Sequence, residues 1–565
     1  MLERLTVLPP GFFAEDGKRL SLQAYVFLVL LCLAFFTPGL ASLPPTDRDE
    51  SLFAQASKQM IESGNYVDIR FQDQPRYKKP IGIYWLQAAS AWLLDPHHRN
   101  EIWAYRVPSF LGATLAVLMT AALGALLFGG RAGLLGAIMM AGCLILNVEA
   151  RLAKTDAALL GSIMVAQYAL AQAYIGAKTA PIGGGTRLAF WTTLAAGVLL
   201  KGPVILLVIF STLLWLRVTE KHLRWFAALK PLIGIPYALA LIAPWFIAIM
   251  LASHGQFVQQ AAGHDLLDKL WQDQGRGFLP PGSYLLAFPL SFFPFALWAL
   301  LAAPDSWISR RQPAVRFCLG WIIPVWIAFE LVLAKLPHYV MPVYPAIALL
   351  TAKALLDGFP GLKEWRWLPP LATGLWLMAG TCVALAAVLL PFMLDHKWNA
   401  GQIAAGLLVV MALGASLLIF FRRRESGIVV TAAASLVFMM NLFGTTLPHT
   451  QNLWVSSQVA RTALLLKPCP GDLALVSTYN APSLVFLAGT RTLLRNDGKA
   501  VGDLMRQDPC RVAAVEDKQR DNFLRSFAQN GAQPQSLASI HGLDVSRGRM
   551  VDVSLFILPQ GKPAP

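Results

Sequence analysis

The chain has 565 residues, of which 56% are hydrophobic, and its mean hydropathy is +0.53. These values exclude a large soluble enzyme and predict a membrane protein with many spans. The formal net charge is +15, from 47 Lys and Arg against 32 Asp and Glu. Because the chain has no arginine-rich tail and no aromatic-basic RNA-binding motif, we assign this charge to cytoplasmic loops and expect no nucleic-acid partner.

Thirteen apolar segments predict a mainly α membrane protein with about 13 transmembrane helices. They lie at 22–42, 104–128, 131–148, 152–176, 187–200, 202–217, 231–251, 283–302, 315–334, 338–356, 366–391, 402–421 and 427–446. With a cytoplasmic N-terminus, the clusters of Lys and Arg fall on the cytoplasmic side. The loops 43–103, 149–155 and 252–282 and the C-terminus then lie outside. Since no small-residue cleavage site follows the first span, we expect an uncleaved signal anchor.

The first outer loop is the longest polar interruption between two spans. Within it, apolar residues recur at helical spacing over 49–60 and 80–92, which predicts two juxtamembrane helices that lie on the bilayer surface. Asp49 and Glu50 stand in the first turn of the first helix. Acids at this place either cap the helix or serve as functional groups, and the spacing leaves both interpretations open.

Three cations, Arg76, Lys78 and Lys79, come directly before Pro80, which fits the first position of the second helix. The helix dipole disfavours cations there by about 0.3–1 kcal/mol. We therefore expect an anion at this helix end, and beside a membrane the phosphate of a lipid headgroup suits it. The alternative is a general basic patch that touches anionic lipids.

Charged residues also mark three shorter outer turns. Asp156 either caps the span that follows it or supplies a second acid at the membrane edge. Lys201 precedes Gly-Pro in a tight turn, which favours a structural role. Lys335, His338 and Tyr339 stand at the outer membrane boundary, where a snorkelling lysine and an interfacial tyrosine need no further function.

The loop 252–282 carries His264, Asp268, Lys269 and Arg276. His264 and Asp268 are four residues apart, so both side chains fall on one helix face and two metal ligands are one interpretation. Two residues do not make a metal site, however. Lys269 is a second candidate for binding a phosphate.

The composition becomes that of a soluble domain after Leu447, which predicts a division into 1–448 and 449–565. Strand-like and helix-like segments then alternate from 473 to 558, as in a small α/β domain. Cys469 and Cys510 are the two of the six cysteines that lie outside the apolar spans. In an oxidising periplasm they are expected to form a disulfide, with two free thiols as the alternative.

Together the outer loops supply carboxylates, cations and interfacial aromatic residues on one face. This combination suits the transfer of a group from a lipid phosphate to an acceptor hydroxyl. Cations stabilise the departing phosphate, and a carboxylate orients or deprotonates the acceptor. The sequence has no P-loop and no Gly-rich strand-turn-helix, so we expect no nucleotide site.

Six short motifs occur in the order Asp49-Glu50, Tyr77-Lys-Lys-Pro80, Lys154-Thr-Asp156, Lys201-Gly-Pro203, His264 with Lys269, and Lys335-Leu-Pro-His-Tyr339. This order resembles that in the C-type membrane glycosyltransferases. Within them it is most similar to the branch of bacterial lipid A aminoarabinose transferase and the protein O-mannosyltransferases. The resemblance implies an enzyme of the bacterial inner membrane with a periplasmic site and a polyprenyl-phosphate (undecaprenyl-phosphate) sugar donor.

The resemblance also implies roles for single residues. Asp49 matches the catalytic aspartate, Glu50 stands beside it, and Asp156 matches the acid of the second outer loop. The residues expected to bind the lipid phosphate are Lys79, Lys269, Tyr77, Tyr339, Lys78 and Arg276. Lys269 stands where the family usually has an arginine, so a bidentate contact is lost.

One position departs from the family pattern. Lys78 stands where the aminoarabinose transferase has a glutamate that binds a metal together with the loop histidine. His264 is kept, so a divalent metal at His264 is one alternative, but we expect that no cofactor is required. The same change weakens the inference that lipid A is the acceptor.

The sequence thus predicts a monomeric glycosyltransferase that moves a sugar from a polyprenyl phosphate to a lipid or glycan acceptor such as lipid A. We expect inversion, because direct attack on the donor needs one displacement. A protein acceptor is the first alternative. A non-catalytic polyprenyl-phosphate carrier is the second, although a carrier predicts charges along the membrane interior rather than at one surface. The third is an assembly or sensor protein in which 449–565 binds a partner.

Overall fold

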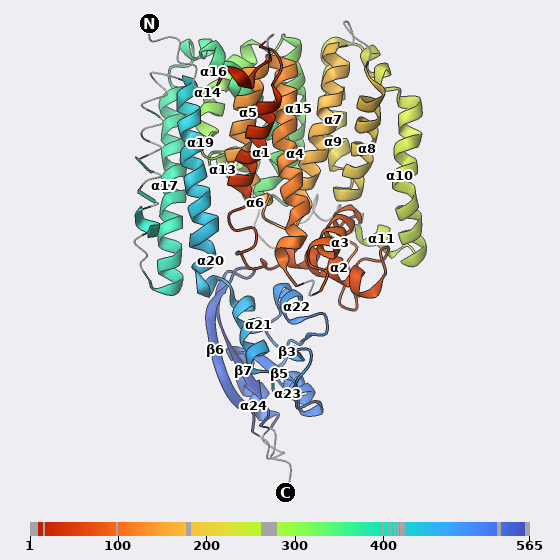
Figure 1. The fold of residues 1–565 in the computed structure, drawn as a ribbon, viewed down its shortest axis with the longest axis vertical. Coiled ribbons are helices and arrows are strands. Elements are labelled where there is room, and N and C mark those ends of the chain that lie inside the picture. Colours follow the sequence, from red (N-terminus) through yellow and green to blue (C-terminus); the bar gives the residue numbers. More distant parts are fainter. Residues whose placement is uncertain are drawn as a thin grey trace.

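The computed structural model describes residues 9–14, 17–97, 100–176, 182–261, 280–397, 424–527 and 533–559, with scattered residues between 401 and 417. Seven of its helices are long and apolar enough to cross a membrane. They are α4 (Ile102–Phe128), α7 (Asp156–Gly176), α10 (Pro231–Ala252), α15 (Pro313–Leu331), η4 with α16 (Pro337–Asp357), α17 (Leu368–Asp395) and the run from α19 to α20 (Glu425–His449). These helices form a bundle with the C-terminal elements at one end (Figure 1).

Shorter helices fill the remaining predicted spans. They are α1 (Leu22–Phe36), α5 (Gly130–Gly142), α6 (Leu144–Glu149), α8 (Gly184–Lys201), α9 (Val204–Glu220), α13 (Ser283–Ser291) and α14 (Ala296–Ile308). Prolines explain two differences from the predicted bounds, since α1 ends before Pro38 and the segment 283–302 is divided at Pro294. The segment 402–421 lies mostly outside the described residues, so the count of thirteen spans stays a prediction.

Close packing of small residues places the beginning of α7 against α4. A Cβ atom on Gly112 of α4 would lie 2.5 Å from the Cα of Ala158, and one on Gly161 would lie 2.8 Å from the carbonyl oxygen of Gly112. Small residues let two helix backbones approach in this way in membrane proteins. The contact fixes Asp156, the first residue of α7, beside the outer end of α4.

The first outer loop contains α2 (Asp49–Ser63), a hairpin of β1 (Arg70–Phe71) and β2 (Gln74–Pro75), and α3 (Gly82–Leu94). Both predicted helices are therefore present. The second begins at Gly82, and the prediction that Pro80 is its first residue was wrong. At this start α3 lies close against α8, since a Cβ on Gly82 would lie 2.8 Å from the backbone of Leu199.

The C-terminal region, defined as residues 450–559, contains a five-stranded sheet in the order β4-β3-β5-β7-β6. The strands are β3 (Leu475–Ser477), β4 (Leu493–Leu494), β5 (Val512–Glu516), β6 (Gln535–Asp544) and β7 (Arg549–Ile557), and the helices are α21 (Val455–Leu466), α22 (Pro482–Ala488), α23 (Gly498–Gln507) and α24 (Asp517–Arg525). β3 is parallel to β4 and β5, whereas β7 is antiparallel to β5 and β6. Neither β6 nor α21 was expected from the sequence.

Two separate apolar clusters cover the two faces of this sheet. Leu475 of β3 packs with α21 and α22, while its neighbour Val476 packs with α23 and α24. This division follows from the alternation of side chains along a strand. Cys469 and Cys510 form a disulfide with a Cα–Cα distance of 5.3 Å, which confirms that prediction. The domain boundary near 448 stays a prediction.

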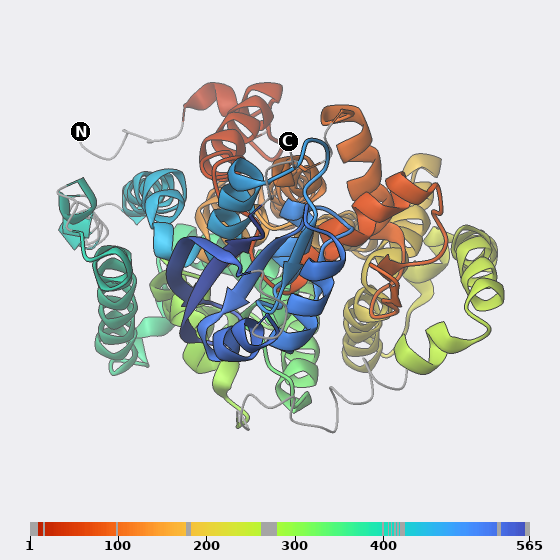
Figure 2. The ribbon, with the colours of Figure 1, turned by 90° about the horizontal axis from the view of Figure 1, so that it is seen from below.

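The C-terminal region contacts the first outer loop directly. Gln55 of α2 donates a hydrogen bond to the hydroxyl of Thr490 at 2.7 Å, and the amide of Gln72 donates to the carbonyl oxygens of Thr490 and Thr492 at 3.1 and 2.5 Å. The ring of Tyr105 in α4 meets the ring of Phe486 edge-on. Viewed from below, the C-terminal region lies in front of the bundle with α2 and α3 beside it (Figure 2).

Candidate active site

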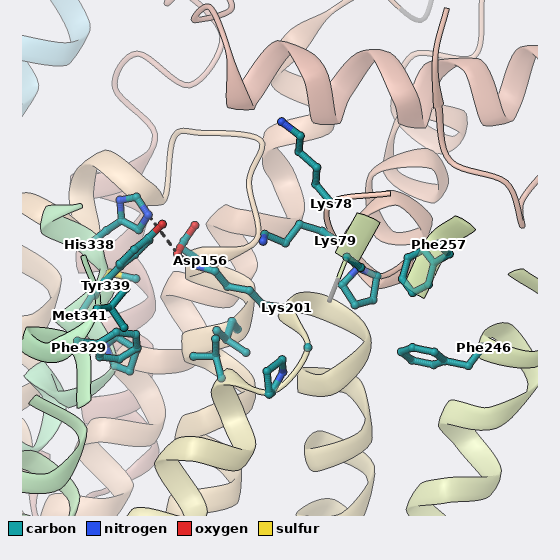
Figure 3. Close-up of a pocket in the computed structure, with 18 of the residues that line it drawn as sticks. Lys78, Lys79, Asp156, Lys201, Phe246, Phe257, Phe329, His338, Tyr339 and Met341 are labelled. Carbon is teal, nitrogen blue, oxygen red and sulfur yellow. Dashed lines mark hydrogen bonds and ion pairs between the residues drawn. The ribbon is translucent and has the colours of Figure 1, made fainter. Parts of the chain in front are cut away.

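A cavity of about 320 Å³ lies between the first outer loop, the beginning of α7, the turn from α8 to α9, the end of α10 and η4 (Pro337–Val343). Its polar lining residues are Lys78, Lys79, Asp156, Lys201, His338 and Tyr339 (Figure 3). The rest of its wall is mainly apolar and includes Leu159, Val204, Phe246, Phe329, Val332 and Met341. A cavity with a charged part and an apolar wall suits an amphipathic ligand.

Asp156 is the buried acid of this cavity. Its carboxylate forms an ion pair with Lys201 of α8, and Nε2 of His338 lies 3.6 Å from the same oxygen. Lys201 also lies 5.3 Å from the centre of the Tyr339 ring, within the range of a cation–π contact. Gly202 ends α8 with φ of 65° and ψ of −133°, a conformation that favours glycine and turns the chain beside Lys201.

Glu149 extends this network beyond the cavity. Its Oε1 accepts a hydrogen bond from Nζ of Lys154 at 3.0 Å and lies 3.5 Å from Nδ1 of His338. The imidazole of His338 therefore stands between two acids. Burial raises the pKa of Glu149, and the charge of Asp156 adds to this rise, although Lys154 acts in the opposite direction.

Asp49 is the exposed first residue of α2, and its carboxylate is not part of the cavity lining. It acts on the same network, because burial lowers the pKa of Lys154 but Glu149, Asp156 and also Asp49 raise it above its usual value. Arg48, directly before it, has φ of 67°. A left-handed backbone costs a residue with a side chain of order 1–3 kcal/mol, and such positions cluster at functional sites.

Glu50 has a different environment from its neighbour. Its side chain is completely buried in an ion pair with Arg106 at 2.7 Å, and it also accepts hydrogen bonds from the backbone N–H groups of Thr46 and Ala153. Burial alone would raise its pKa, but Arg106 and these donors hold the pKa below its usual value. Glu50 thus joins the first outer loop to α4 and to the turn before α7.

The predicted phosphate ligands of the first outer loop divide into two groups. Lys78 and Lys79 line the cavity, and Figure 3 shows Lys79 directed toward Asp156 and Lys78 directed away from it. Tyr77 does not line the cavity, since its hydroxyl donates to Asp68 at 2.7 Å and its ring packs against Phe257 in the cavity wall. Burial and this hydrogen bond raise the pKa of Tyr77 to about 12.

Arg76 does not support the expected group of three cations before α3. Its guanidinium is buried, contacts the hydroxyl of Tyr84 and lies 4.5 Å from the centre of the Phe53 ring. Arg76 therefore joins α2 to α3. The prediction that all three cations face one anion was wrong for this residue.

The predicted residues His264, Lys269 and Arg276 lie outside the described residues. In the part of the chain that the structure describes, no three His, Cys, Asp or Glu side chains are grouped as a metal site. Two of the three outer loops nevertheless bring their predicted residues to one place, with Asp156 and Lys79 at the same cavity.

Comparison with known proteins supports the sequence resemblance. Residues 78–247 match the family model described as dolichyl-phosphate-mannose-protein mannosyltransferase. The undecaprenyl phosphate-alpha-4-amino-4-deoxy-L-arabinose arabinosyl transferase of Pectobacterium carotovorum is 24% identical over 69% of this chain and 68% of its own length. Its counterpart in Pseudomonas aeruginosa PAO1 is 26% identical over 58% of this chain and 59% of its own length.

Solved structures agree in fold. The crystal structure of ArnT from Cupriavidus metallidurans bound to undecaprenyl phosphate has a TM-score of 0.71 at 18% identity and covers 94% of this chain and 97% of its own. The oligosaccharyltransferase AglB from Archaeoglobus fulgidus has a TM-score of 0.50 at 12% identity and covers 88% of this chain and 69% of its own. The chain thus resembles the C-type membrane glycosyltransferases in sequence and in fold. The resemblance predicted from the six motifs is thereby confirmed.

Two residues of this glycosyltransferase site were underestimated from sequence. Lys201 and His338 were assigned structural roles at the membrane edge, but both contact Asp156 and line the cavity. They lie 45 and 182 residues from Asp156 in the chain, and no local pattern reports such a contact. The ion pair of Arg106 with Glu50 was also not predicted. A single arginine at the end of an apolar segment has the sequence pattern of a snorkelling residue.

Proposed function

We propose that this glycosyltransferase transfers a sugar from undecaprenyl phosphate, or a related polyprenyl phosphate, to a lipid or glycan acceptor such as lipid A. One observation carries the proposal, namely that a single cavity combines Lys79, Lys201 and Asp156 with a largely apolar wall. Such a cavity suits a phosphate joined to a hydrocarbon chain. The names of the curated relatives, which specify an undecaprenyl-phosphate-linked sugar, support the same donor.

In the proposed reaction the acceptor hydroxyl attacks the anomeric carbon of the donor sugar. The new carbon–oxygen bond forms as the bond to the phosphate oxygen breaks, and polyprenyl phosphate leaves with the electron pair. Lys79 and Lys201 stabilise the negative charge that develops on the phosphate, with Lys269 and Arg276 as further predicted cations. Asp49 accepts the proton of the attacking hydroxyl. A single displacement of this kind inverts the anomeric centre.

The chain is a polytopic inner-membrane protein, and we propose that it crosses the membrane thirteen times with its active site in the periplasm. The cytoplasmic assignment of the basic loops supports this orientation. Ser63, at the exposed end of α2, offers a test. A cysteine at position 63 should react with an impermeant maleimide added to spheroplasts, whereas one at Ser309, in a predicted cytoplasmic connection, should react only after lysis.

The function is tested by transfer from undecaprenyl-phosphate-linked sugar, extracted from membranes, to lipid A by the purified protein in detergent. Asp49→Asn should lower the transfer rate about 10²- to 10⁴-fold, the usual contribution of a general base, and leave binding of undecaprenyl phosphate unchanged. Asp73→Asn is the matched control, since Asp73 is also an exposed acid of the first outer loop. Equal rates for wild type and Asp49→Asn would favour a carrier or scaffold.

A protein acceptor remains the second candidate, because the matching family model is described as a protein mannosyltransferase. Mass spectrometry of envelope glycolipids and glycoproteins from cells with and without the gene separates the two. The proposal expects a sugar to disappear from a glycolipid when the gene is deleted. Its disappearance from serine or threonine residues instead would favour the protein acceptor.

A further inference from the structure

A second cavity, of about 310 Å³, lies between the first outer loop and the C-terminal region. It shares no lining residue with the first cavity. One side consists of the segment 44–48, directly before α2. The other side consists of Leu453, Trp454, Val455, Ser456, Ser457, Tyr479, Ser483, Leu543, Val545 and Ser546.

The lining of this second cavity has the chemistry of a sugar-binding site. It is rich in hydroxyl groups, which both donate and accept hydrogen bonds, and the hydroxyl-bearing residues are Thr46, Ser456, Ser457, Tyr479, Ser483 and Ser546. Trp454 and Tyr479 add aromatic rings, which suit the apolar C–H face of a pyranose. Its charged side chains are one acid, Asp47, and one base, Arg48, so the lining carries no net charge and does not favour an anion.

Asp47 holds an oxygen available to a ligand. Its Oδ1 accepts hydrogen bonds from the hydroxyl and the backbone N–H of Ser483, and Ser483 in turn contacts the hydroxyl of Ser456 at 2.5 Å. The other oxygen, Oδ2, accepts no hydrogen bond from the described residues. The protein thus fixes the orientation of this carboxylate and leaves one acceptor atom for a hydroxyl of the bound molecule.

The second cavity is also next to the candidate catalytic acid. Arg48 lines the cavity and directly precedes Asp49. Asp49 also acts electrostatically on Lys154, whose Nζ donates a hydrogen bond to Glu149 and through it joins the network of the first cavity. Asp49 is therefore next in the chain to a residue of the cavity with hydroxyls and aromatic rings, and it acts electrostatically on the network of the cavity with cations and apolar walls.

We propose that the second cavity binds a sugar unit of the acceptor, so that a hydroxyl of this glycan reaches Asp49. The proposal rests on the proposed function, in which the first cavity holds the donor. It assigns the C-terminal region a direct role in acceptor recognition, with the segment 44–48 as the shared wall.

A third cavity, of about 700 Å³, is a weaker candidate for the acceptor. It lies between α2 and the C-terminal region and is lined by Lys58, Glu62, Arg461, Asp472 and Arg491 among others. Lys58 is nine residues after Asp49, which corresponds to about 13 Å along an α-helix. A hydroxyl bound beside Lys58 is therefore too far from Asp49 for direct proton transfer.

The test uses a substitution that narrows the opening of the second cavity and leaves the protein core unchanged. Val545 is 57% exposed, and Val545→Trp adds bulk at the opening. Met550→Trp is the matched control, because Met550 is an exposed apolar residue of the neighbouring strand, 45% exposed, and does not line the cavity. Lipid A in detergent micelles is the probe, and its binding is measured in the absence of donor as well as through transfer.

We expect Val545→Trp to weaken lipid A binding and to raise the KM for lipid A at least 10-fold, with undecaprenyl phosphate binding unchanged. Met550→Trp should match the wild type. Unchanged lipid A binding in Val545→Trp, loss of affinity for undecaprenyl phosphate instead, or no lipid A binding by the wild type would each overturn the proposal. The proposal would also be overturned if Val545→Trp raised the KM for a serine-containing peptide acceptor but left the KM for lipid A unchanged. If lipid A binds at this cavity but no sugar is transferred, the proposed function fails while the binding site stands.

Discussion

Two buried charge clusters of this glycosyltransferase, that of Glu50 with Arg106 and that of Glu149 with His338 and Asp156, differ in how completely their acids are hydrogen-bonded. Both oxygens of Glu50 accept hydrogen bonds from Arg106, from Thr46 and from the backbone of Ala153. In the other cluster, His338 stands between Glu149 and Asp156 at 3.5 and 3.6 Å, and Oε2 of Glu149 accepts no hydrogen bond from the described residues. A saturated acid fixes structure, whereas an unsaturated cluster beside a cavity keeps capacity for a ligand.

The same difference in burial and hydrogen bonding distinguishes two adjacent acids, Asp49 and Glu50, whose roles the sequence alone does not distinguish. Asp49 and Glu50 are consecutive, yet Asp49 is exposed and Glu50 is fully buried. Glu50 therefore acts as a positioning residue that holds the beginning of α2, and Asp49 is the one free to meet a substrate. The predictions below test this separation, from the largest expected effect to the smallest.

The largest effect is expected for Glu50→Gln. The substitution leaves the buried guanidinium of Arg106 without its counter-charge, and breaking a buried ion pair in this way costs about 3–5 kcal/mol. Thermal unfolding in detergent, followed by fluorescence, should show a clear decrease in Tm. The remaining folded protein should keep its affinity for undecaprenyl phosphate.

A double variant sharpens the same prediction. Glu50→Leu with Arg106→Met removes both charges at once, so no buried charge is left unpaired, and it should lose less stability than Glu50→Gln alone. A double variant that unfolds as easily as Glu50→Gln would show that the ion pair is not the main contribution of Glu50.

The next effect is expected for Lys201→Met. If Lys201 binds the donor phosphate, the substitution removes a charge-assisted contact of about 1.5–3 kcal/mol, which corresponds to roughly 10- to 150-fold weaker binding of undecaprenyl phosphate. Lys335→Met is the control, since Lys335 lies near η4 but does not line the cavity. Equal affinities for the two variants would exclude Lys201 from the phosphate site.

The sequence predicted local features of this molecule well and distant pairings poorly. Apolar segments, the helices of the first outer loop and the strand β5 follow from periodicity, because each depends on neighbouring residues. The contacts of His338 with Glu149 and of Arg106 with Glu50 join residues 189 and 56 positions apart. Such contacts depend on how helices pack, and this information is not contained in any local pattern.

The strand β6 (Gln535–Asp544) illustrates a different limit. Its residues do not alternate cleanly between apolar and polar, since the strand lies at the edge of the sheet and much of it is exposed. Only its antiparallel pairing with β7 defines it. An edge strand of this kind is specified by its neighbour, so sequence periodicity alone does not report it.

A smaller effect is expected from pH, again through Glu50. Its folded-state pKa lies below the ordinary value of 4.5, so the unfolded chain takes up a proton first as the pH falls. Its contribution to stability is therefore complete above about pH 6 and is lost progressively as the pH falls through 4.5 and below. The Tm of the wild type should fall more steeply between pH 6 and pH 4 than that of Glu50→Gln. Parallel curves would contradict the lowered pKa.

The smallest effect is expected for Ser483→Ala, which removes the hydroxyl that donates to Asp47. The cost to stability should be about 1 kcal/mol, the usual contribution of a single hydrogen bond, because the backbone N–H of Ser483 still reaches Asp47. The change loosens a contact of the C-terminal region with the segment 44–48, directly before Asp49. The KM for lipid A should therefore rise more than the small decrease in Tm suggests. Thr490→Ala removes a hydroxyl that contacts Gln55 and Glu62 farther along α2, and it should lower Tm at least as much without this rise in KM. Equal KM values for the two variants would mean that the C-terminal region stabilises α2 as a whole and does not position its acid-bearing end.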